Sequence, residues 1–213
     1  MSFSAFCRTL TGLKKQVSKS KFTKVEAFLP TKYGDFFVTA YKEETGGEHL
    51  ILSKNIRSEK PVLVRVHSSC KTGDVFGSLR CDCGAQLDHA MKMLEKNGSG
   101  VLIYLNQEGR GIGLFNKIQT YILQDAGLDT VEANKQLGFP PDLRDYYTAA
   151  AILKDLGITK ISLITNNPDK VEQLTKSGIE VVHTIPLEIA PNKFNKKYLM
   201  TKKQKLHHKL TLV

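Results

Sequence analysis

Three cysteines, Cys70, Cys81 and Cys83, stand close together in the stretch HSSCKTGDVFGSLRCDCGAQ. Thiolates are good ligands for zinc, which takes them at about 2.3 Å in tetrahedral geometry. A closed structural zinc site has four protein ligands, whereas three protein ligands leave one position for water, as in catalytic sites. Zinc lowers the pKa of such a water to about 7, so that hydroxide is available at neutral pH. The spacing C-x10-C-x-C therefore predicts a metal site with one open position.

Other interpretations of the three thiols stay open on the sequence alone. Either His67 or His89 would close the site as a fourth ligand. A redox pair is less favoured, because its usual spacing is C-x-x-C and not C-x-C. Buried thiols without a metal are disfavoured, because the second and third cysteines both adjoin the charged residue Asp82. The signature of the zinc deaminases, H-x-E followed by P-C-x-x-C, does not match this spacing.

A second group of candidate residues lies in YLNQEGRGIGLFNK, residues 104–117, where three glycines alternate with other residues. A glycine-rich turn that leads from a strand into a helix exposes backbone N–H groups that hold phosphate. The segment does not fit the Walker A pattern, and the glycines alone are equally consistent with a plain tight turn. Glu108 and Arg110 favour a nucleotide site, because a carboxylate accepts hydrogen bonds from a base or ribose and arginine binds phosphate bidentately.

The segment PPDLRDYY, residues 140–147, places Asp142 and Arg144 two positions apart behind two prolines. In an extended chain, residues two apart point to the same side and can act together. The alternative is the start of a helix with Asp142 or Asp145 as its cap.

The segment LITNNPDK, residues 163–170, ends a strand in a polar loop that contains Thr165 and Lys170. Loops at the carboxyl ends of strands build the ligand sites of open α/β sheets. Asp169 is equally suited to cap the following helix, so this loop is ambiguous by itself.

The elements that position these residues follow from hydrophobic periodicity. Alternating or clustered β-forming residues predict strands at 36–43, 49–54, 61–67, 101–105, 161–165 and 179–185. Helical spacing that stops near a glycine predicts helices at 87–97, 114–126, 146–156 and 171–177. The first half is mostly β, and the second half alternates strand and helix. We therefore predict a single mixed α/β domain, α+β in organisation, with a β-rich N-terminal half.

The composition is that of a soluble globular protein, with 41% hydrophobic and 24% charged residues. No apolar run approaches the roughly 18 residues that span a bilayer, and the opening segment lacks the apolar region and cleavage site of a signal peptide. We therefore expect a cytoplasmic protein with no membrane partner. A reducing compartment favours metal ligation over a disulfide framework for clustered cysteines.

The net charge of +10 is concentrated at the two ends of the chain. A positive surplus attracts polyanions, such as nucleic acid or a phosphorylated small molecule. Basic runs of this kind are usually solvated arms, which is our interpretation of residues 1–24 and of the tail NKFNKKYLMTKKQKLHHKL. A targeting segment is the alternative for the N-terminal arm.

The ordered motifs RVHSSC, GSLRCDCG, NQEGRGIGL, DTVEAN, QLGF followed by DLRD, and TNNPDK resemble the GTP cyclohydrolase II family. The resemblance extends from about residue 25 to residue 210 and implies one catalytic domain with the GTP cyclohydrolase II-like fold over 25–210. It implies an enzyme of riboflavin biosynthesis that opens the imidazole ring of GTP, releasing formate and pyrophosphate. The product implied is 2,5-diamino-6-ribosylamino-4(3H)-pyrimidinone 5′-phosphate. One Zn²⁺ per subunit on Cys70, Cys81 and Cys83, Mg²⁺ at the triphosphate and a homodimer are also implied.

The resemblance also implies residue roles. Arg144 matches an arginine proposed as nucleophile on the α-phosphorus, Asp142 a nearby general base, and Tyr121 a tyrosine near the zinc water. Because a guanidinium stays protonated in water, an electrostatic role of Arg144 on the departing pyrophosphate is the alternative. The implied GTP-binding positions are Arg65, Val66, His67, Ser68, Ser69, Gln86, Glu108, Gly109, Arg110, Thr130, Thr165 and Lys170.

Two positions depart from the family pattern: Ser69 stands where glutamate is common, and His207 stands where glycine is expected before His208. A zinc-stabilised nucleic-acid-binding module is a competing interpretation of the cysteines and the charge. It is disfavoured, because the anion-binding candidates are single residues at strand ends and the chain has no tryptophan and no RNA-binding aromatic motif. A related purine hydrolase that stops at a formamide intermediate is a third interpretation.

Overall fold

The computed structural model describes residues 22–57 and 59–213. The described strands are β1 (Phe22–Thr31), β2 (Gly34–Glu43), β3 (Glu48–Lys54), β4 (Val62–Ser68), β5 (Gly100–Leu105), β6 (Lys160–Ile164) and β7 (Glu180–Ile185). The helices are α1 (Lys71–Asp74), α2 (Cys83–Asn97), α3 (Gly113–Asp125), α4 (Thr130–Gln136), α5 (Tyr147–Asp155), α6 (Pro168–Lys176) and α7 (Lys196–Lys205), with a 3₁₀ turn, η3, over Glu108–Gly111.

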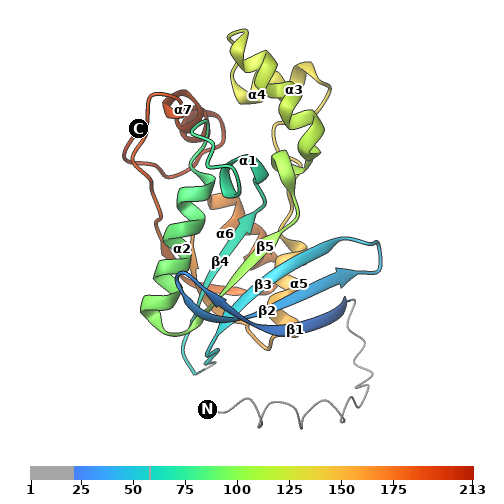
Figure 1. The fold of residues 1–213 in the computed structure, drawn as a ribbon, viewed down its shortest axis with the longest axis vertical. Coiled ribbons are helices and arrows are strands. Elements are labelled where there is room, and N and C mark those ends of the chain that lie inside the picture. Colours follow the sequence, from blue (N-terminus) through green and yellow to red (C-terminus); the bar gives the residue numbers. More distant parts are fainter. Residues whose placement is uncertain (1–21, 58) are drawn as a thin grey trace.

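The seven strands form one sheet in the order β1-β2-β3-β5-β4-β6-β7. The first three strands and β5 pair antiparallel, whereas β4 is parallel to both β5 and β6, and β6 is parallel to β7. The carboxyl ends of β4, β5 and β6 therefore meet at one edge, where α1, α3, α4 and α7 gather (Figure 1). An open sheet with parallel strands binds ligands at this edge.

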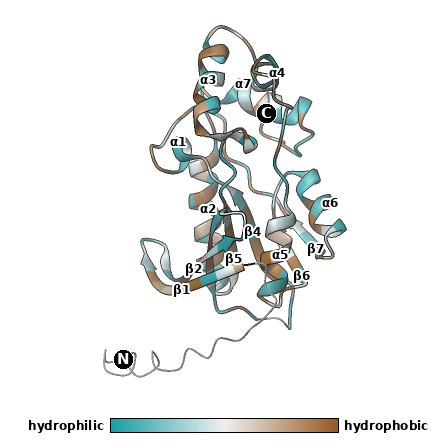
Figure 2. Cartoon of the chain, turned by 90° about the vertical axis from the view of Figure 1, so that its right-hand side faces the viewer, coloured by the Kyte–Doolittle hydropathy of each residue, from teal (hydrophilic) through white to brown (hydrophobic). Residues whose placement is uncertain are grey.

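Helices cover the two faces of the central strands, and alternate residues of these strands belong to different cores. In β4, Val62, Val64 and Val66 pack with α5 and α6, whereas Leu63 packs with α2. Central strands covered on both faces read as continuous apolar runs, which is why 61–67 and 101–105 were recognisable. Figure 2 shows the hydrophobic residues gathered on these strands and α5, while α7 is largely hydrophilic.

The predicted fold class is confirmed, and each predicted strand and helix is present with boundaries that differ by a few residues. β1 begins at Phe22, so residues 22–24 lie in the sheet and not in the arm; the rest of the predicted arm lies outside the described residues. β1 was not predicted; its residues are mostly exposed on both faces, and the alternation of Val25, Ala27 and Leu29 is interrupted by Phe28. Among the described residues no helix is long and apolar enough to span a membrane.

The interpretation of the basic tail as a solvated arm is wrong. Residues 196–205 form α7, and Leu199, Thr201 and Leu210 are buried. α7 was missed because it carries no apolar stripe: Leu199 is buried, but other contacts of the helix with the rest of the chain are polar. Lys202, for example, forms an ion pair with Asp82.

A candidate active site at the carboxyl ends of the parallel strands

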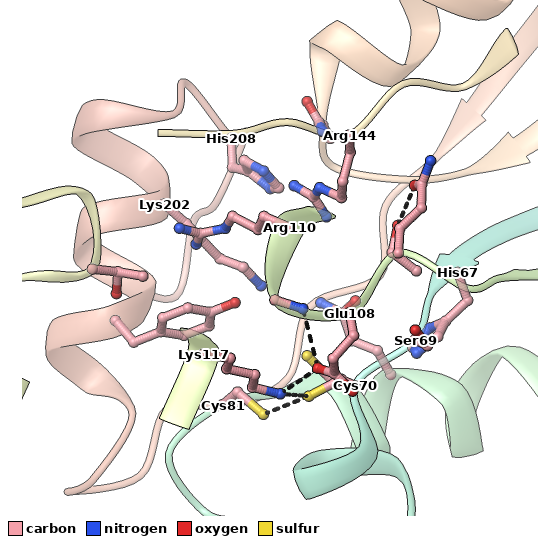
Figure 3. A pocket seen from close by; sticks show the side chains of 18 of the residues that line it. His67, Ser69, Cys70, Cys81, Glu108, Arg110, Lys117, Arg144, Lys202 and His208 are labelled. Atoms are coloured by element: carbon pink, nitrogen blue, oxygen red, sulfur yellow. Dashed lines mark hydrogen bonds and ion pairs between the residues drawn. The ribbon is translucent and has the colours of Figure 1, made fainter. Parts of the chain in front are cut away.

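One cavity lies at the edge of the sheet where β4, β5 and β6 end, and Figure 3 shows its side chains converging. Its lining comes from the segments that follow these three strands and from α2, α3, α4 and α7. Arg65 and His67 reach it because they lie on the α2 face of β4, near the end of the strand. The strand topology thus brings together motifs that are about a hundred residues apart in the sequence.

The three cysteines face one another at one side of this cavity. Their sulfur atoms lie within 4.8 Å of one another, and the Sγ atoms of Cys70 and Cys81 are 3.7 Å apart. Hydrogen bonds from the neighbouring thiols of Cys81 and Cys83, with the Lys117 ammonium beside them, hold the pKa of Cys70 below its ordinary value. An all-sulfur group of this size fits a soft tetrahedral metal such as zinc.

Two glycines allow the cysteines to approach. A Cβ on Gly73 would lie 2.9 Å from the Cys81 sulfur and 3.1 Å from the Cys70 sulfur, and one on Gly84 would lie 2.3 Å from the carbonyl oxygen of Gly73. The start of α2 and the turn of α1 are therefore in backbone contact, which holds the two halves of the thiol group together.

Buried carboxylates hold the thiol-bearing loop in place. Asp74 accepts hydrogen bonds from the backbone N–H of Cys70 at 2.9 Å and from the Tyr104 hydroxyl at 2.8 Å, and it lies 3.2 Å from Nε2 of His67. His67 also stacks on the Tyr104 ring, with centroids 5.4 Å apart. Within the described residues, neither His67 nor His89 joins the group of potential metal ligands.

Glu108 and Lys117 connect the glycine-rich turn to the thiols. Lys117 Nζ donates to Cys70 Sγ at 3.1 Å and to Glu108 Oε1 at 2.8 Å. The other oxygen of Glu108 accepts from the backbone N–H of Lys71 at 2.7 Å. A cation at this distance favours the thiolate form, which is the form that binds metal.

Arg110 is a buried cation without a hydrogen-bonding partner. It is 9% exposed, and neither Nη1 nor Nη2 has a partner within the described chain. Both Gly109 and Arg110 adopt left-handed backbone conformations, with φ of 62° and 60°. A residue other than glycine, such as Arg110, rarely adopts this backbone conformation, and a buried charged group is rarely left without a partner. Both features are typical of a functional site that binds an anion.

Arg144 reaches the same cavity from the segment after the prolines. Its Nη2 and Nε donate to Asp142 at 2.5 and 2.9 Å, and the backbone N–H of Arg144 donates to the same carboxylate at 3.0 Å, in a segment without regular secondary structure before α5 begins at Tyr147. The prediction that Asp142 and Arg144 act on the same side is therefore consistent with the geometry. Burial alone would lower the pKa of Arg144, but neighbouring Tyr146 and Asp142 hold it above its ordinary value. The guanidinium is therefore protonated.

The comparisons with known proteins agree with this geometry. The family model described as GTP cyclohydrolase II matches residues 22–186. The chain belongs to the GTP cyclohydrolase II family. It is 54% identical over 200 residues to the riboflavin biosynthesis protein RibBA of Chlorobium phaeovibrioides, covering 92% of this chain and 49% of that protein. The RibBA proteins of Bacillus cytotoxicus (54% over 190 residues, 88% and 48%) and Aquifex aeolicus (55% over 185 residues, 85% and 46%) are similar.

The chain spans about half the length of these curated relatives. Among solved structures, RibBX from A. baumannii, described as a two-domain 3,4-dihydroxy-2-butanone 4-phosphate synthase, is matched over 81% of this chain and 41% of that chain. Its identity is 21% and its TM-score 0.44, a likeness too weak to support an argument.

Most positions that the family resemblance singled out line the cavity, and Val66 and Asp142 do not. Val66 is buried in the core, and its carbonyl oxygen accepts a hydrogen bond from Lys170 Nζ at 2.6 Å. Asp142 contacts the cavity only through Arg144. The lining positions are Arg65, His67, Ser68, Ser69, Cys70, Cys81, Cys83, Gln86, Glu108, Gly109, Arg110, Tyr121, Thr130, Arg144, Thr165 and Lys170.

The alternatives left open for two of the family motifs are now decided at the level of local structure. Asn167, not Asp169, caps α6 by accepting from the backbone N–H of Asp169 at 3.0 Å. The N-cap of α5 is Tyr146, without a side-chain cap, and neither Asp142 nor Asp145; Asp145 accepts from the backbone N–H of Tyr147 at 3.1 Å. Ser69, which departs from the family pattern, is 5% exposed, and its hydroxyl has no partner within the described chain.

Several residues around the site were not singled out by the sequence reading: Asp74, Lys117, Tyr198, Lys202 and His208. Lys117 closes the glycine-rich segment, and a lysine four residues after Gly113 was a readable signal for an anion site. Asp82 was noted only as a neighbour of the cysteines. It is 3% exposed and accepts from Lys202 Nζ and Gln86 Nε2, each at 2.6 Å. When the partner of a buried carboxylate lies far away in the sequence, local spacing does not reveal it.

Proposed function

We propose that this chain is a GTP cyclohydrolase II that opens the imidazole ring of GTP and releases formate and pyrophosphate. The product would be 2,5-diamino-6-ribosylamino-4(3H)-pyrimidinone 5′-phosphate. Membership of the GTP cyclohydrolase II family supports this activity. The chain spans about half the length of its curated relatives, so the activity of the whole relative is not carried over directly. The observation that carries the proposal is one cavity that joins a three-thiol group to the unpaired, buried guanidinium of Arg110.

Cys70, Cys81 and Cys83 would hold one Zn²⁺, and the soft donor set supports this choice of metal. When bound, zinc polarises water and so provides a nucleophile for C8 of the purine at neutral pH. Mg²⁺ would enter with the triphosphate, since it is usually bound through substrate phosphates and keeps several waters.

Tyr121 is suited to donate a proton or a hydrogen bond beside the thiols. Burial raises the pKa of its phenol, so the hydroxyl is protonated at neutral pH. The hydroxyl lies 3.0 Å from Oγ1 of Thr72, which in turn lies 3.7 Å from Cys70 Sγ. We propose that Tyr121 orients the groups that react at the purine ring.

Arg144 would act on the phosphates by charge. Its pKa is raised, and Asp142 occupies its Nε and Nη2, so a neutral nucleophilic guanidine is disfavoured. The guanidinium stabilises negative charge on the departing pyrophosphate, and Asp142 holds it in position. The pKa of Asp142, which burial alone would raise, is held below its ordinary value by Arg144, so the carboxylate is charged.

The remaining predicted residues would bind GTP. Arg65 donates to Gln86 Oε1 at 2.6 Å and is held at the base of the cavity. Burial and the nearby cations Arg65 and Arg144 lower the pKa of Lys170, and a polyphosphate would offset this concentration of positive charge.

We further propose a homodimer located in the cytoplasm. Phe76, Phe115 and Ile122 are 80%, 77% and 67% exposed, and the ion pair between Arg80 and Asp125 joins their two segments. Such an apolar surface suits a second copy of the chain. The three cysteines are free thiols, as expected in a reducing compartment. Light scattering should give twice the chain mass of 23.8 kDa, and Phe115→Asp should give the monomer.

The activity is tested by incubating the zinc-loaded chain with GTP and Mg²⁺ and measuring formate, pyrophosphate and the pyrimidine product. Formate release should be abolished by a zinc chelator and by Cys83→Ser, whereas Cys7→Ser, which keeps Cys70, Cys81 and Cys83, should leave it unchanged. A zinc-loaded chain that releases no formate from GTP would overturn the proposal. Formate release without pyrophosphate would show a reaction that stops earlier.

A further inference from the structure

The segment after β7 contributes to the cavity, although the family match ends at residue 186. Leu187, Tyr198, Lys202, His208 and Leu210 line it beside the thiols and the residues of the glycine-rich turn. None of these five positions is among the residues for which the resemblance implies a role. The segment therefore adds side chains to the site beyond those already described.

The segment is anchored at several points and does not merely rest on the surface. Lys202 pairs at 2.6 Å with Asp82, which lies between Cys81 and Cys83 in the sequence; the Asp82 side chain is buried and that of Lys202 is only 11% exposed. The backbone N–H of Lys209 donates to the carbonyl oxygen of Asn166 at 2.8 Å, in the loop after β6. The backbone N–H of Thr211 donates to Glu188 at 2.8 Å. These contacts place His208 between the end of β6 and the start of α2.

Unpaired donors gather where this segment meets the glycine-rich turn. Tyr198 presents its ring to Arg110 at 5.5 Å and to Lys202 at 4.9 Å, so it positions both cations. The imidazole nitrogens of His208 have no hydrogen-bond partner within the described chain, and its side chain points toward Arg144 (Figure 3). Burial, together with Lys202 and Arg144, lowers the pKa of His208 to about 2, so the ring is neutral with one N–H to donate.

The positive charges around His208 indicate that the ligand is an anion. His208 is within electrostatic range of Lys202, Arg144, Lys170 and Arg110, and Asp82 and Asp142 each pair with only one of these cations. Repulsion from these cations disfavours a metal cation that arrives without an anion. An anion with several oxygens, such as an inorganic polyphosphate or the phosphates of a nucleotide, would satisfy the free donors together.

We propose that His208 is a phosphate-binding residue and that Tyr198 positions Arg110 beside it, so that residues 187–210 complete the polyphosphate subsite. This inference deepens the proposed function and rests on it for the identity of the nucleotide. His208 donates its N–H to a phosphate oxygen, and the neighbouring guanidinium groups neutralise the charge. The purine end of the substrate lies with the thiols and does not contact His208.

The test measures binding of inorganic triphosphate, GMP and guanosine to the full-length, zinc-loaded chain by calorimetry. His208→Leu removes the donor and should weaken triphosphate binding about 10-fold or more, because a hydrogen bond to a charged group is lost. Guanosine binding and zinc content should stay unchanged. His208→Gln, which restores an N–H, should recover most of the affinity. Tyr198→Leu should weaken triphosphate binding less than His208→Leu does.

His207→Asn and Lys203→Met are the matched controls, because both positions are exposed neighbours of lining residues. Both should bind triphosphate as the wild type does. Unchanged triphosphate affinity in His208→Leu, an equal loss of guanosine affinity, or no triphosphate binding by the wild type would each overturn the inference. A chain that binds triphosphate through His208 yet releases no formate from GTP would overturn the proposed function and leave this subsite standing.

Discussion

Replacing Lys202 by methionine should destabilise the protein strongly, because it leaves the carboxylate of Asp82 buried without its cation. The two side chains are 11% and 2% exposed, and the N–O distance is 2.6 Å. At this distance, the attraction is about 6 kcal/mol with an effective dielectric constant of about 20. Desolvation of both groups offsets much of it, and the loss on breaking one side of a buried pair is about 3–5 kcal/mol.

We expect the lower end of this range, about 3 kcal/mol, for Lys202→Met. Asp82 keeps its hydrogen bond from Gln86 Nε2 at 2.6 Å, so part of the carboxylate remains satisfied. Asp82→Asn should cost a similar amount, because it leaves the Lys202 ammonium, which is only 11% exposed, without its carboxylate. The double variant should lose little more than either single variant, with a coupling energy of at least about 2 kcal/mol.

The assay is urea unfolding of the zinc-loaded chain, followed by circular dichroism, with the free energy of unfolding extrapolated to water. Lys203→Met, on the exposed side of α7, is the control and should change the free energy by less than about 0.5 kcal/mol. Single-variant losses under about 1 kcal/mol, or losses that simply add in the double variant, would refute the reasoning that this pair is a buried, coupled anchor.

Four further outcomes follow from the geometry. Gly73→Ala should lower zinc content sharply, measured by atomic absorption, because its Cβ would lie 2.9 Å from the Cys81 sulfur; full zinc occupancy would contradict this. His207→Gly should raise the free energy of unfolding by about 1 kcal/mol, because His207 has φ of 55°, where glycine is favoured; a lower urea midpoint would argue against it. Arg144→Ala should abolish pyrophosphate release, measured with a coupled phosphate assay; release near the wild-type rate would exclude both roles considered for this arginine. His208, with a pKa lowered from 6.5 to about 2, stays neutral in the folded protein while the unfolded chain takes up a proton below pH 6.5. The contribution of neutral His208 to the free energy of unfolding is therefore complete above pH 6.5 and falls by about 1.4 kcal/mol per pH unit below it. The wild type should consequently lose stability faster than His208→Leu between pH 6.5 and 5 in urea titrations. Parallel pH profiles would show that this histidine is not shielded from protons.

The candidate metal-binding cysteines and the central strands were readable from the sequence for different reasons. The cysteine spacing and the neighbouring charged residues pointed to a metal without reference to the rest of the chain. Strands covered on both faces, such as β4 and β5, appear as continuous apolar runs, and α2 and α3 have the helical period. α4 begins with a capping box between Asp129 and Glu132, a signal present in the sequence and not used.

Glu108 illustrates how far a local interpretation extends. The sequence favoured it as an acceptor for a base or ribose. In the structure, its oxygens hold Lys117 and the backbone of Lys71. Residue type and position predicted a carboxylate that takes part in the site, but its partners come from α1 and α3, and no spacing in the sequence specifies them.

The sequence by itself determined the family, the three cysteines of the candidate metal site and the order of the central strands and of α2, α3, α5 and α6, because these depend on residue types at short, regular spacing. Only the tertiary structure decided which distant side chains meet, as when Lys202 reaches Asp82 and His208 enters the cavity near Arg144. Such contacts depend on the parallel order of β4, β5 and β6, which collects loops from distant parts of the chain at one edge. The basic tail shows the difference, because a run of lysines has the same local pattern in solvent and against a buried carboxylate. Packing alone distinguishes the two.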